Sequence, residues 1–390
     1  MRLRPVRRMG RDRLAGGRPI AGRGGLRTRD RRGPAGTRPP HATSTIRGMS
    51  EQEPTRVEQV TKLLNLISGY HVTHLLEIAR ELGIWELITA EPGVTARELA
   101  KRLGTEPFYS EVLCRTAFAF DLLARERDGW RMAPHFDEIL GTPDSTFYLG
   151  RAAQVHMQVG RDYAEMPRRF RDGSIFTFQD HDAAFIEAVA ASLKTLPQIL
   201  TDVVLPKLPK LERRFADGAR VLDVGCGAGW ALVHLAERFP KTTCVGVDIE
   251  PRSIELANDL IRSRGLARRC AARVMGAERL AEDGAYDIAT SFLVVHEIPP
   301  AVKEDAFRGV ARCLVPGGSF VIFDETYPET DAELRTMPTR FAALAQWFEL
   351  TWGNRVNTRA EVDALCAQAG LRIADETRYS RFAIIVAEKK

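Results

Sequence analysis

Residues 220–230 read Arg-Val-Leu-Asp-Val-Gly-Cys-Gly-Ala-Gly-Trp, an apolar run that breaks into alternating glycines. The apolar run predicts a strand, the glycines predict a tight turn, and the helical pattern that begins near Trp230 predicts a helix. Three glycines in five positions allow positive φ angles and let a ligand approach the main chain, because no side chain stands in the way. The stretch therefore predicts a strand, loop and helix that together hold a ligand.

The spacing of the glycines decides which ligand the loop fits. A dinucleotide fingerprint needs G-x-G-x-x-G, or Ala at the last position, where a small residue lets the helix pack closely on the strand. Counted from Gly225, that position is Trp230, which is too large for this part. The G-x-G-x-G form after the acidic Asp223 instead resembles motif I of the class I methyltransferases that use S-adenosylmethionine (SAM).

The next predicted strand, residues 243–248, ends in a carboxylate, Asp248, about twenty residues after the glycines. In such folds a carboxylate at this distance accepts hydrogen bonds from ribose hydroxyls. We therefore predict that Asp248 binds ribose. The alternative is that Asp248 only caps a helix that starts near Pro251, since Asp is a common residue at helix starts.

Strand and helix patterns alternate from Gly218 onward, which predicts a doubly wound α/β sheet. The last two strands are too close in sequence for a helical crossover, so the last strand is expected to run antiparallel. An extra helix over residues 331–350 is expected to supply one wall of a substrate pocket. The expected strands lie near 219–224, 243–248, 271–275, 285–292, 319–324, 371–376 and 381–387, and the expected helices near 229–239, 251–264, 301–314 and 359–369.

Charge is distributed unevenly along the chain. Residues 1–50 contain 14 arginines, no lysine and two acids, Asp12 and Asp30. Of the 56 basic and 51 acidic side chains in the whole chain, 42 and 49 therefore remain after residue 50, and that part is acidic. The first fifty residues are rich in Arg, Gly and Pro and are predicted to be a disordered basic extension. A nucleic-acid-binding arm is one interpretation, but we favour an upstream extension of the reading frame with Met49 as the natural start.

The composition also bears on the compartment. The six cysteines are scattered without a C-x-x-C pair, which fits a reducing cytoplasm and argues against a disulfide framework or a structural zinc site. The eight histidines are dispersed as well, so we expect no metal. No apolar run approaches the ~20 residues of a membrane span. The sequence thus predicts a cytoplasmic protein without a membrane partner.

Residues 51–140 have the pattern of a winged-helix module. The expected elements are two helices between Val57 and Leu87 joined near residues 69–71, a capped helix over 95–104, a helix over 108–123 and a hairpin over 123–134 that turns at Asp128-Gly129. The helix that would enter a DNA groove carries only Arg115 against Glu111 and Asp121. Groove reading needs basic and amide side chains, so dimerisation or packing is the favoured role and nucleic-acid binding is disfavoured.

Residues 141–215 are less regular, with recurring aromatic and methionine side chains and a predicted helix over 182–205. Such a segment between a helical domain and a cofactor domain commonly forms one wall of a substrate pocket. Any single aromatic here is equally well explained as a core residue. The predicted domains are thus 51–140, a helical linker and pocket segment over 141–215, and a cofactor domain over 216–390.

From Val57 to Lys390 the chain resembles the two-domain methyltransferases that join a winged-helix dimerisation domain to a class I SAM domain, as in plant and bacterial small-molecule O-methyltransferases. The resemblance rests on residues 221–229, 245–248, 286–288 and 314–318. It implies a Rossmann-like, mostly parallel seven-stranded sheet of order 3-2-1-4-5-7-6, with SAM over the carboxyl ends of the strands. It also implies a homodimer through the amino-terminal domain.

The same resemblance implies a set of cofactor-binding residues. Asp223 and the glycine loop would face the methionine part of SAM, and Asp248 its ribose. Where the family often has an Asp near the adenine, this chain has Gly276-Ala277-Glu278, so adenine recognition is expected from Glu278 or from main-chain groups. The full expected set is Asp223, Gly225, Cys226, Gly227, Gly229, Asp248, Ile249 and Glu278.

His296, after the fourth strand, is the candidate general base. In plant-type O-methyltransferases a His-Asp-Trp at this place carries that base, and His296-Glu297-Ile298 is similar, with Glu297 in place of the Asp. A carboxylate after the fifth strand flanks the base in the family, and Asp324 falls at the matching distance. Another acidic position of the family falls on Val356, which cannot orient an imidazole. The alternative is that His296 merely caps the strand or packs beside the cofactor.

The function that these residues predict is SAM-dependent methyl transfer to a small-molecule acceptor, with a hydroxyl as the favoured acceptor and His296 as its base. One alternative is a metal-assisted C-methyltransferase of a keto acid, with His296 as a ligand. The other is a SAM-fold transcriptional regulator, for which a basic recognition surface is missing outside the first fifty residues. The sequence leaves the acceptor atom open, because the same SAM site serves oxygen, nitrogen and carbon.

Overall fold

The computed structural model describes residues 53–337 and 339–390. Residues 56–390 form one compact unit. The basic extension predicted for residues 1–50 lies outside the described residues. The boundaries expected at residues 140 and 215 stay predictions.

The first described elements are one long helix, three shorter helices and a small hairpin. They are α1 (Arg56–Glu81), α2 (Ile84–Ala90), α3 (Ala96–Leu103), α4 (Pro107–Ala119), β1 (Leu123–Glu126) and β2 (Gly129–Met132). The expected capping box begins α3, where the Thr95 hydroxyl accepts the Glu98 N–H at 3.3 Å. The hairpin pairs Glu126 with Gly129 across a two-residue turn. Helix, turn, helix and hairpin therefore follow in the predicted order.

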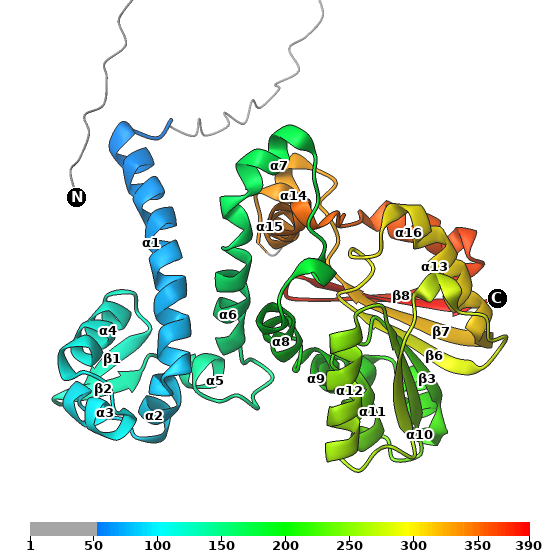
Figure 1. Cartoon of the computed structure of the whole chain (residues 1–390), viewed down its shortest axis with the longest axis horizontal. Helices are drawn as coiled ribbons and strands as arrows, with labels where there is room; N and C mark the ends of the chain where they lie inside the picture. Colours follow the sequence, from blue (N-terminus) through cyan, green and yellow to red (C-terminus); the bar gives the residue numbers. More distant parts are fainter. Residues whose placement is uncertain (1–52, 338) are drawn as a thin grey trace, which may run out of the picture. The chain divides into compact units, whose positions relative to one another are not determined.

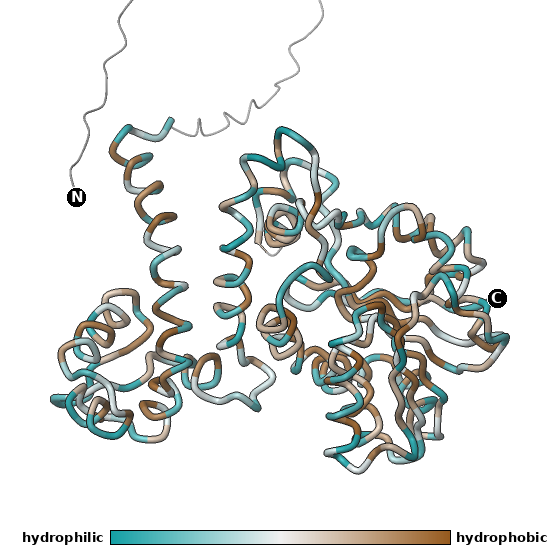
Figure 2. Tube along the Cα trace, viewed as in Figure 1, coloured by the Kyte–Doolittle hydropathy of each residue, from teal (hydrophilic) through white to brown (hydrophobic). Residues whose placement is uncertain are grey.

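Helix α1 differs from the prediction. The expected break near residues 69–71 is absent, because α1 continues through Gly69 and the chain turns at Gly83, whose φ is 74°. A glycine inside a helix costs only ~1 kcal/mol relative to alanine, whereas a positive φ is unfavourable for other residues. Apolar residues recur along the first half of α1 (Figure 2), and the side chains of Leu63 and Leu64 there are 59% and 57% exposed.

The segment between the hairpin and the large sheet is helical but interrupted. Its elements are α5 (Phe136–Leu140), α6 (Gly150–Val159), η1 (Asp162–Ala164), α7 (Met166–Asp172), η2 (Phe178–Asp180), α8 (Ala183–Ser192), α9 (Leu196–Ile199), the π-helical turn η3 (Leu200–Val204), η4 (Leu205–Lys207) and α10 (Pro209–Gly218). The helix predicted over 182–205 is therefore not regular throughout. Its first part ends at Ser192, because Pro197 has no N–H to donate to the carbonyl of Leu193.

One stretch of the described chain, Ala183–Lys207, is long and apolar enough to cross a membrane when judged by length and composition alone. A core helix of a water-soluble protein gives the same signal. Side chains of this stretch, among them Ile186, Val189 and Leu193, line the cavity described below. The stretch therefore has a structural role inside the fold, and the absence of a membrane partner stays a prediction.

The large sheet has seven strands in the order β5-β4-β3-β6-β7-β9-β8 (Figure 1). The strands are β3 (Arg220–Val224), β4 (Thr243–Asp248), β5 (Cys270–Val274), β6 (Tyr286–Phe292), β7 (Leu314–Asp324), β8 (Leu371–Tyr379) and β9 (Phe382–Lys389). Strands β3 to β7 are parallel, and β9 pairs antiparallel with both β7 and β8. The predicted order and the antiparallel last strand are confirmed.

Two buried layers, one on each face, hold helices on the sheet. One layer joins α10, α11 (Trp230–Arg238) and α12 (Pro251–Ser263) to the sheet, with Phe215 and Leu232 fully buried. The other joins α13 (Pro300–Cys313) and α16 (Arg359–Gln368), with Phe307 and Phe320 in edge-to-face contact. Helices on both faces make this the expected doubly wound fold, because a parallel sheet needs apolar cover on each side.

The extra helix predicted over 331–350 is divided in two. It comprises α14 (Asp331–Leu334) and α15 (Thr339–Glu349), and the 3₁₀ turn η6 (Leu350–Trp352) follows. A capping box between Thr330 and Glu333 starts α14. Helix α15 ends at Glu349, a buried carboxylate, and this position brings it to the site.

Candidate active site

The glycine loop after β3 has the predicted conformation. Gly225, Gly227 and Gly229 have φ angles of 66°, 50° and 79°, which side-chain-bearing residues rarely adopt. A Cβ on Gly225 would lie 2.4 Å from a methyl group of Val294, and a Cβ on Gly229 would lie 3.0 Å from the Cβ of Ala257. The first glycine therefore admits the loop after β6, and the last lets α11 pack on α12.

Asp223 lies at the end of β3 and is almost fully buried. Its Oδ1 accepts a hydrogen bond from the Thr290 hydroxyl at 2.6 Å. Burial raises the pKa of this carboxyl to about 7, because the hydrogen bond from Thr290 only partly offsets the loss of water. Asp223 is thus poised to gain or lose a proton near neutrality.

Asp248 ends β4 and braces the glycine loop. Its Oδ2 accepts the Gly227 N–H at 2.9 Å, and its Oδ1 accepts the Glu250 N–H at 2.9 Å. The cap of α12 is Glu250, whose side chain accepts the Arg252 N–H at 2.9 Å. The alternative role of Asp248 as the helix cap is therefore excluded. Burial raises its pKa.

A cavity of about 430 Å³ lies over the carboxyl ends of β3, β4 and β6. Seven of the eight predicted cofactor residues line it, including the exposed Ile249 and the partly exposed Glu278. Gly229 does not line it, and its role is to pack α11 on α12. The glycine main chain, which no Cβ covers, and the carboxylates of the buried Asp223 and the partly buried Asp248 fit the amino-acid and hydroxyl groups of a SAM-sized ligand.

His296 lies on the loop after β6, where Leu293 has a φ of 57° and donates its N–H to the Phe323 carbonyl. The His296 imidazole is buried, with Nδ1 2.6 Å from Oδ1 of Asp324. The main-chain N–H of His296 donates to the other oxygen of Asp324 at 3.2 Å. Asp324 therefore fixes both the position and the ring orientation of His296, as the sequence predicted.

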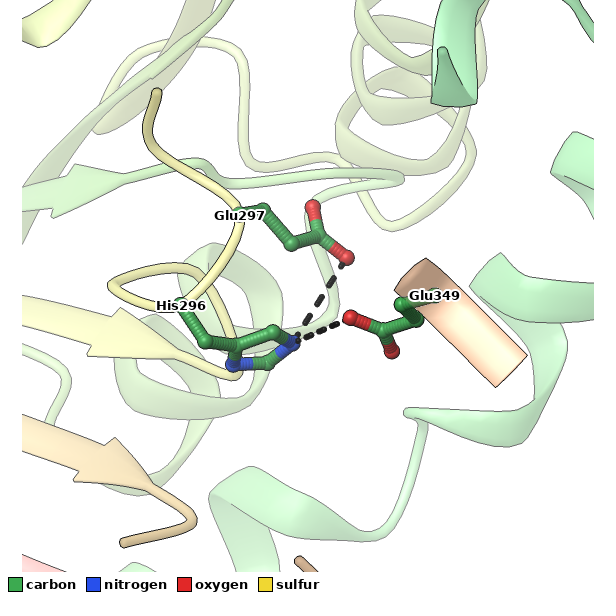
Figure 3. A group of neighbouring side chains, drawn as sticks. All are labelled: His296, Glu297 and Glu349. Carbon is green, nitrogen blue, oxygen red and sulfur yellow. Dashed lines mark ion pairs between the residues drawn. The ribbon is translucent and has the colours of Figure 1, made fainter. Parts of the chain in front are cut away.

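Two further carboxylates face the other ring nitrogen (Figure 3). Nε2 of His296 lies 3.3 Å from Oε2 of Glu349 and 4.0 Å from Oε1 of Glu297. The side chain of Glu297 is 34% exposed and lines the cavity, whereas His296 and Asp324 lie buried behind it. Access to Nε2 from the cavity therefore passes Glu297.

The assignment of the second acidic position to Val356 is wrong. Val356 is buried among Ala342, Ala345 and Tyr327, and the acid that meets His296 is Glu349. The sequence analysis looked for this acid after the extra helix. In the structure the last residue of α15, Glu349, already lies beside the imidazole. Glu349 is the only acidic residue in α15, but the helix predicted over 331–350 also contains Asp331 and Glu333, so the sequence alone did not single it out.

The carboxylates control the protonation of His296. Burial alone would lower its pKa, but the charges of Asp324 and Glu349 and their hydrogen bonds raise it well above 6.5. Burial raises the pKa of Glu297 to about 8, partly offset by the charge of His296. An imidazolium that donates from both nitrogens is therefore the favoured resting form.

A polar segment after η6 holds these groups in place. Asn354, which lines the cavity, donates from Nδ2 to Oε2 of Glu349 at 3.1 Å. The Arg355 N–H donates to the His296 carbonyl at 3.1 Å. Gln346 accepts the Val356 N–H at 2.8 Å and donates to the Asn354 carbonyl at 3.1 Å. Neither Asn354 nor Trp352, which also lines the cavity, was predicted as a site residue.

Comparisons with known proteins agree with this geometry. The methyltransferase domain family matches residues 221–318, and the O-methyltransferase dimerisation domain family matches residues 64–136. The chain therefore carries a methyltransferase domain and an O-methyltransferase dimerisation domain. Its cofactor is SAM, and its amino-terminal helices form the dimerisation domain of such an enzyme. In this methyltransferase the match over residues 221–318 includes the glycine loop, much of the cavity lining and His296.

The methyltransferase is similar to several named proteins. It is 26% identical over 86% of its length to 3-hydroxy-5-methyl-1-naphthoate 3-O-methyltransferase of Streptomyces sahachiroi, of which it covers 95%. It is 30% identical over 30% of its length to the sterol 4-C-methyltransferase strm-1 of Caenorhabditis elegans, of which it covers 33%. The chain thus spans about a third of one curated relative and nearly all of another.

Solved structures show the same fold. Human N-acetylserotonin methyltransferase in complex with SAM superposes with a TM-score of 0.66 at 17% identity, covering 87% of this chain and 99% of that one. An O-methyltransferase family protein from Burkholderia thailandensis superposes with a TM-score of 0.65 at 20% identity, covering 85% and 98%. At these identities the likeness concerns the fold alone.

Proposed function

We propose that this methyltransferase methylates a hydroxyl group of a small molecule, with His296 as the general base. The arrangement that carries the proposal is the buried imidazole between Asp324 at 2.6 Å and Glu349 at 3.3 Å, beside the cavity wall formed by Glu297. A base, a group that orients it and a cavity for the reacting atoms are what proton removal requires.

When bound, SAM would supply a methyl group on a sulfonium, from which in-line attack of an oxygen on the methyl carbon releases the neutral thioether of demethylated SAM. The glycine loop, Asp223 and Asp248 bind the cofactor at the carboxyl ends of β3 and β4. Asp324 holds Nδ1 of His296, so that Nε2 is the atom that takes the hydroxyl proton, either directly or through one water. Because the raised pKa keeps Nε2 protonated near neutrality, the base form grows as the pH rises.

The test is transfer of a labelled methyl group from SAM to a panel of phenols, amines and keto acids. Transfer to oxygen that rises with pH above neutrality supports the proposal. Transfer only to nitrogen or carbon would contradict it. The same panel tests the first alternative from the sequence analysis, metal-assisted C-methylation of a keto acid, because it includes keto acids as acceptors.

That alternative has one observation in its favour. Ligand atoms of His296, Glu297 and Glu349 lie within 4.8 Å of one another, a spacing that a divalent ion could bridge. The Asp324 carboxylate on Nδ1 is also the partner that metal-bound histidines commonly have. Elemental analysis of the purified protein, and assays with a chelator, separate the two functions, because the hydroxyl mechanism proposed here requires no metal.

We further propose that the methyltransferase is a cytoplasmic homodimer. The match of residues 64–136 to a dimerisation domain and the exposed apolar side chains of α1 support the dimer. All six cysteines are free and buried, in keeping with a reducing compartment. The regulator alternative is disfavoured, because α4 exposes Phe108, Tyr109 and Val112 rather than a row of cations.

A further inference from the structure

The cavity lining divides into a cofactor side and an acceptor side. Residues after β3, β4 and β5 form the cofactor side and carry the carboxylates of Asp223, Asp248 and Glu278. The opposite wall comes from η2, α8, α9, η6 and the start of α11, and its larger side chains are Phe178, Ile186, Val189, Leu193, Trp230 and Trp352. An acceptor that reaches Glu297 therefore lies against aromatic and aliphatic surface.

The ionisable side chains of this lining are all acidic. Four carboxylates line the cavity, those of Asp223, Asp248, Glu278 and Glu297, and none of the described lining residues is a lysine, arginine or histidine. On the acceptor side the polar side chains are neutral, Thr177, Gln179 and Asn354, apart from Glu297. An anionic group on an acceptor would find no lysine or arginine side chain in this lining to pair with.

Cations at the edge of the cavity are already engaged. Lys194, next to the lining residue Leu193, pairs with Asp144 at 2.8 Å. Arg252, next to the lining residue Ser253, pairs with Glu187 at 2.7 Å and with Glu255 at 3.0 Å. Both side chains are therefore already paired with carboxylates of the protein and are not available to pair with an anionic acceptor.

Two further arginines, the buried Arg169 and the partly exposed Arg381, also lie outside the lining. Arg381 pairs with Glu325 at 3.1 Å and stacks on the Phe341 ring. Arg169 is buried with its guanidinium over the Phe176 ring. Neither side chain borders the cavity.

We propose that the acceptor is an uncharged, largely apolar ring compound bearing the hydroxyl, and that the cavity rejects acceptors with a carboxylate or phosphate group. The inference rests on the proposed hydroxyl methylation and adds the charge class of its substrate. Burying an anion without a partner is costly, and nearby carboxylates add repulsion. A flat ring, by contrast, gains contact with Phe178, Trp230 and Trp352.

The experiment compares two acceptors that differ only in this charge: methyl 3-(4-hydroxyphenyl)propanoate and the free acid. The two methylenes insulate the phenol, so its acidity is nearly the same in both. We expect kcat/KM for labelled methyl transfer to favour the ester by at least about 100-fold at pH 8. A ratio near one, or a preference for the acid, overturns the proposal.

A matched pair of variants tests whether charge in the cavity is the cause. Gln179→Lys brings a cation to the acceptor side and should narrow the ratio between ester and acid at least tenfold. Gln179→Met has similar length without charge and should leave the ratio as in the wild type. If both variants change the ratio equally, the selection has another origin and the proposal is wrong.

A binding assay separates this proposal from the function on which it rests. Trp230 and Trp352 line the cavity, so their fluorescence can report titration of either compound into the protein with demethylated SAM bound. Tighter binding of the ester supports the charge class even if neither compound is methylated, an outcome that would count only against hydroxyl methylation. Equal or tighter binding of the acid contradicts the charge class by itself.

Discussion

His296 Nδ1 and Asp324 Oδ1 lie 2.6 Å apart, which joins the loop after β6 to the end of β7 in the interior of the methyltransferase. The two strands are neighbours, with Phe292 paired to Phe323, so the residues that follow them must approach each other. Their hydrogen bond directs Nε2, the other ring nitrogen, toward Glu349 and Glu297. The order of the strands thus places Asp324 at Nδ1, and this contact decides which ring nitrogen faces Glu349 and Glu297.

His296→Ala should retain SAM affinity and lose ~10²–10⁴-fold in turnover, the usual contribution of a general base. Calorimetric titration with SAM measures the affinity, and labelled methyl transfer measures the turnover. Partial rescue by added imidazole would tie the loss to the missing base. Wild-type turnover with the true acceptor would remove His296 from the chemistry and favour an acceptor that needs no deprotonation.

Glu349→Gln and Val356→Ala distinguish the two candidates for the second acidic position. Asp324 and Glu349 both raise the His296 pKa, and Glu349 lies 3.3 Å from Nε2, so Glu349→Gln removes one of the two charges and should move the pH profile of turnover to lower pH. Val356→Ala only opens a small cavity, and it should lower the free energy of unfolding by about 1–3 kcal/mol with an unchanged pH profile. If both variants have the same pH profile of turnover, Glu349 does not control the His296 pKa and has only a structural role.

Much of this site could be predicted from the sequence, because its parts are tied to strand ends. Buried parallel strands are apolar runs, so Asp223, Asp248 and Asp324 stand out as the carboxylates that end them. Glu349 could not be placed in the same way, because α15 reaches the site through the packing of a helix that lies outside the sheet. The helix break predicted near Gly69 was also wrong, because a single glycine does not end a long helix.

Asp248→Ala should weaken SAM binding by ~10- to 100-fold, because a charged-group hydrogen bond is worth ~1.5–3 kcal/mol and the Gly227 N–H also loses its acceptor. Glu250→Ala is the matched control. It removes the cap of α12, which should cost ~1 kcal/mol of stability and leave SAM affinity nearly unchanged. An unchanged dissociation constant for Asp248→Ala would exclude this residue from the SAM site.

The exposed apolar side chains of α1 should hold the dimer together. The double variant Leu63→Glu and Ile67→Glu places two charges one helical turn apart on a surface that is 59% and 49% exposed in the single chain. We expect light scattering to give a dimer mass for the wild type at micromolar concentration and a monomer mass for the variant. Asn65→Glu, on the same helix, controls for added charge. A monomeric wild type would contradict the dimer.

Asp223 should make cofactor binding depend on pH. Burial raises its pKa to about 7, so below that pH the carboxyl of the free protein carries a proton and is neutral. An ammonium group on the methionine part of the cofactor binds the ionised carboxylate better, so binding must expel this proton. The dissociation constant for demethylated SAM should therefore fall about tenfold per pH unit as the pH approaches 7 from below, and level off above it. Asp223→Asn should bind more weakly and without this slope. Calorimetry at several pH values, in buffers of different ionisation enthalpy, measures both the affinity and the released proton. The same affinity at pH 6 and pH 8 in the wild type would show that Asp223 is already ionised in the free protein or does not meet the ammonium group.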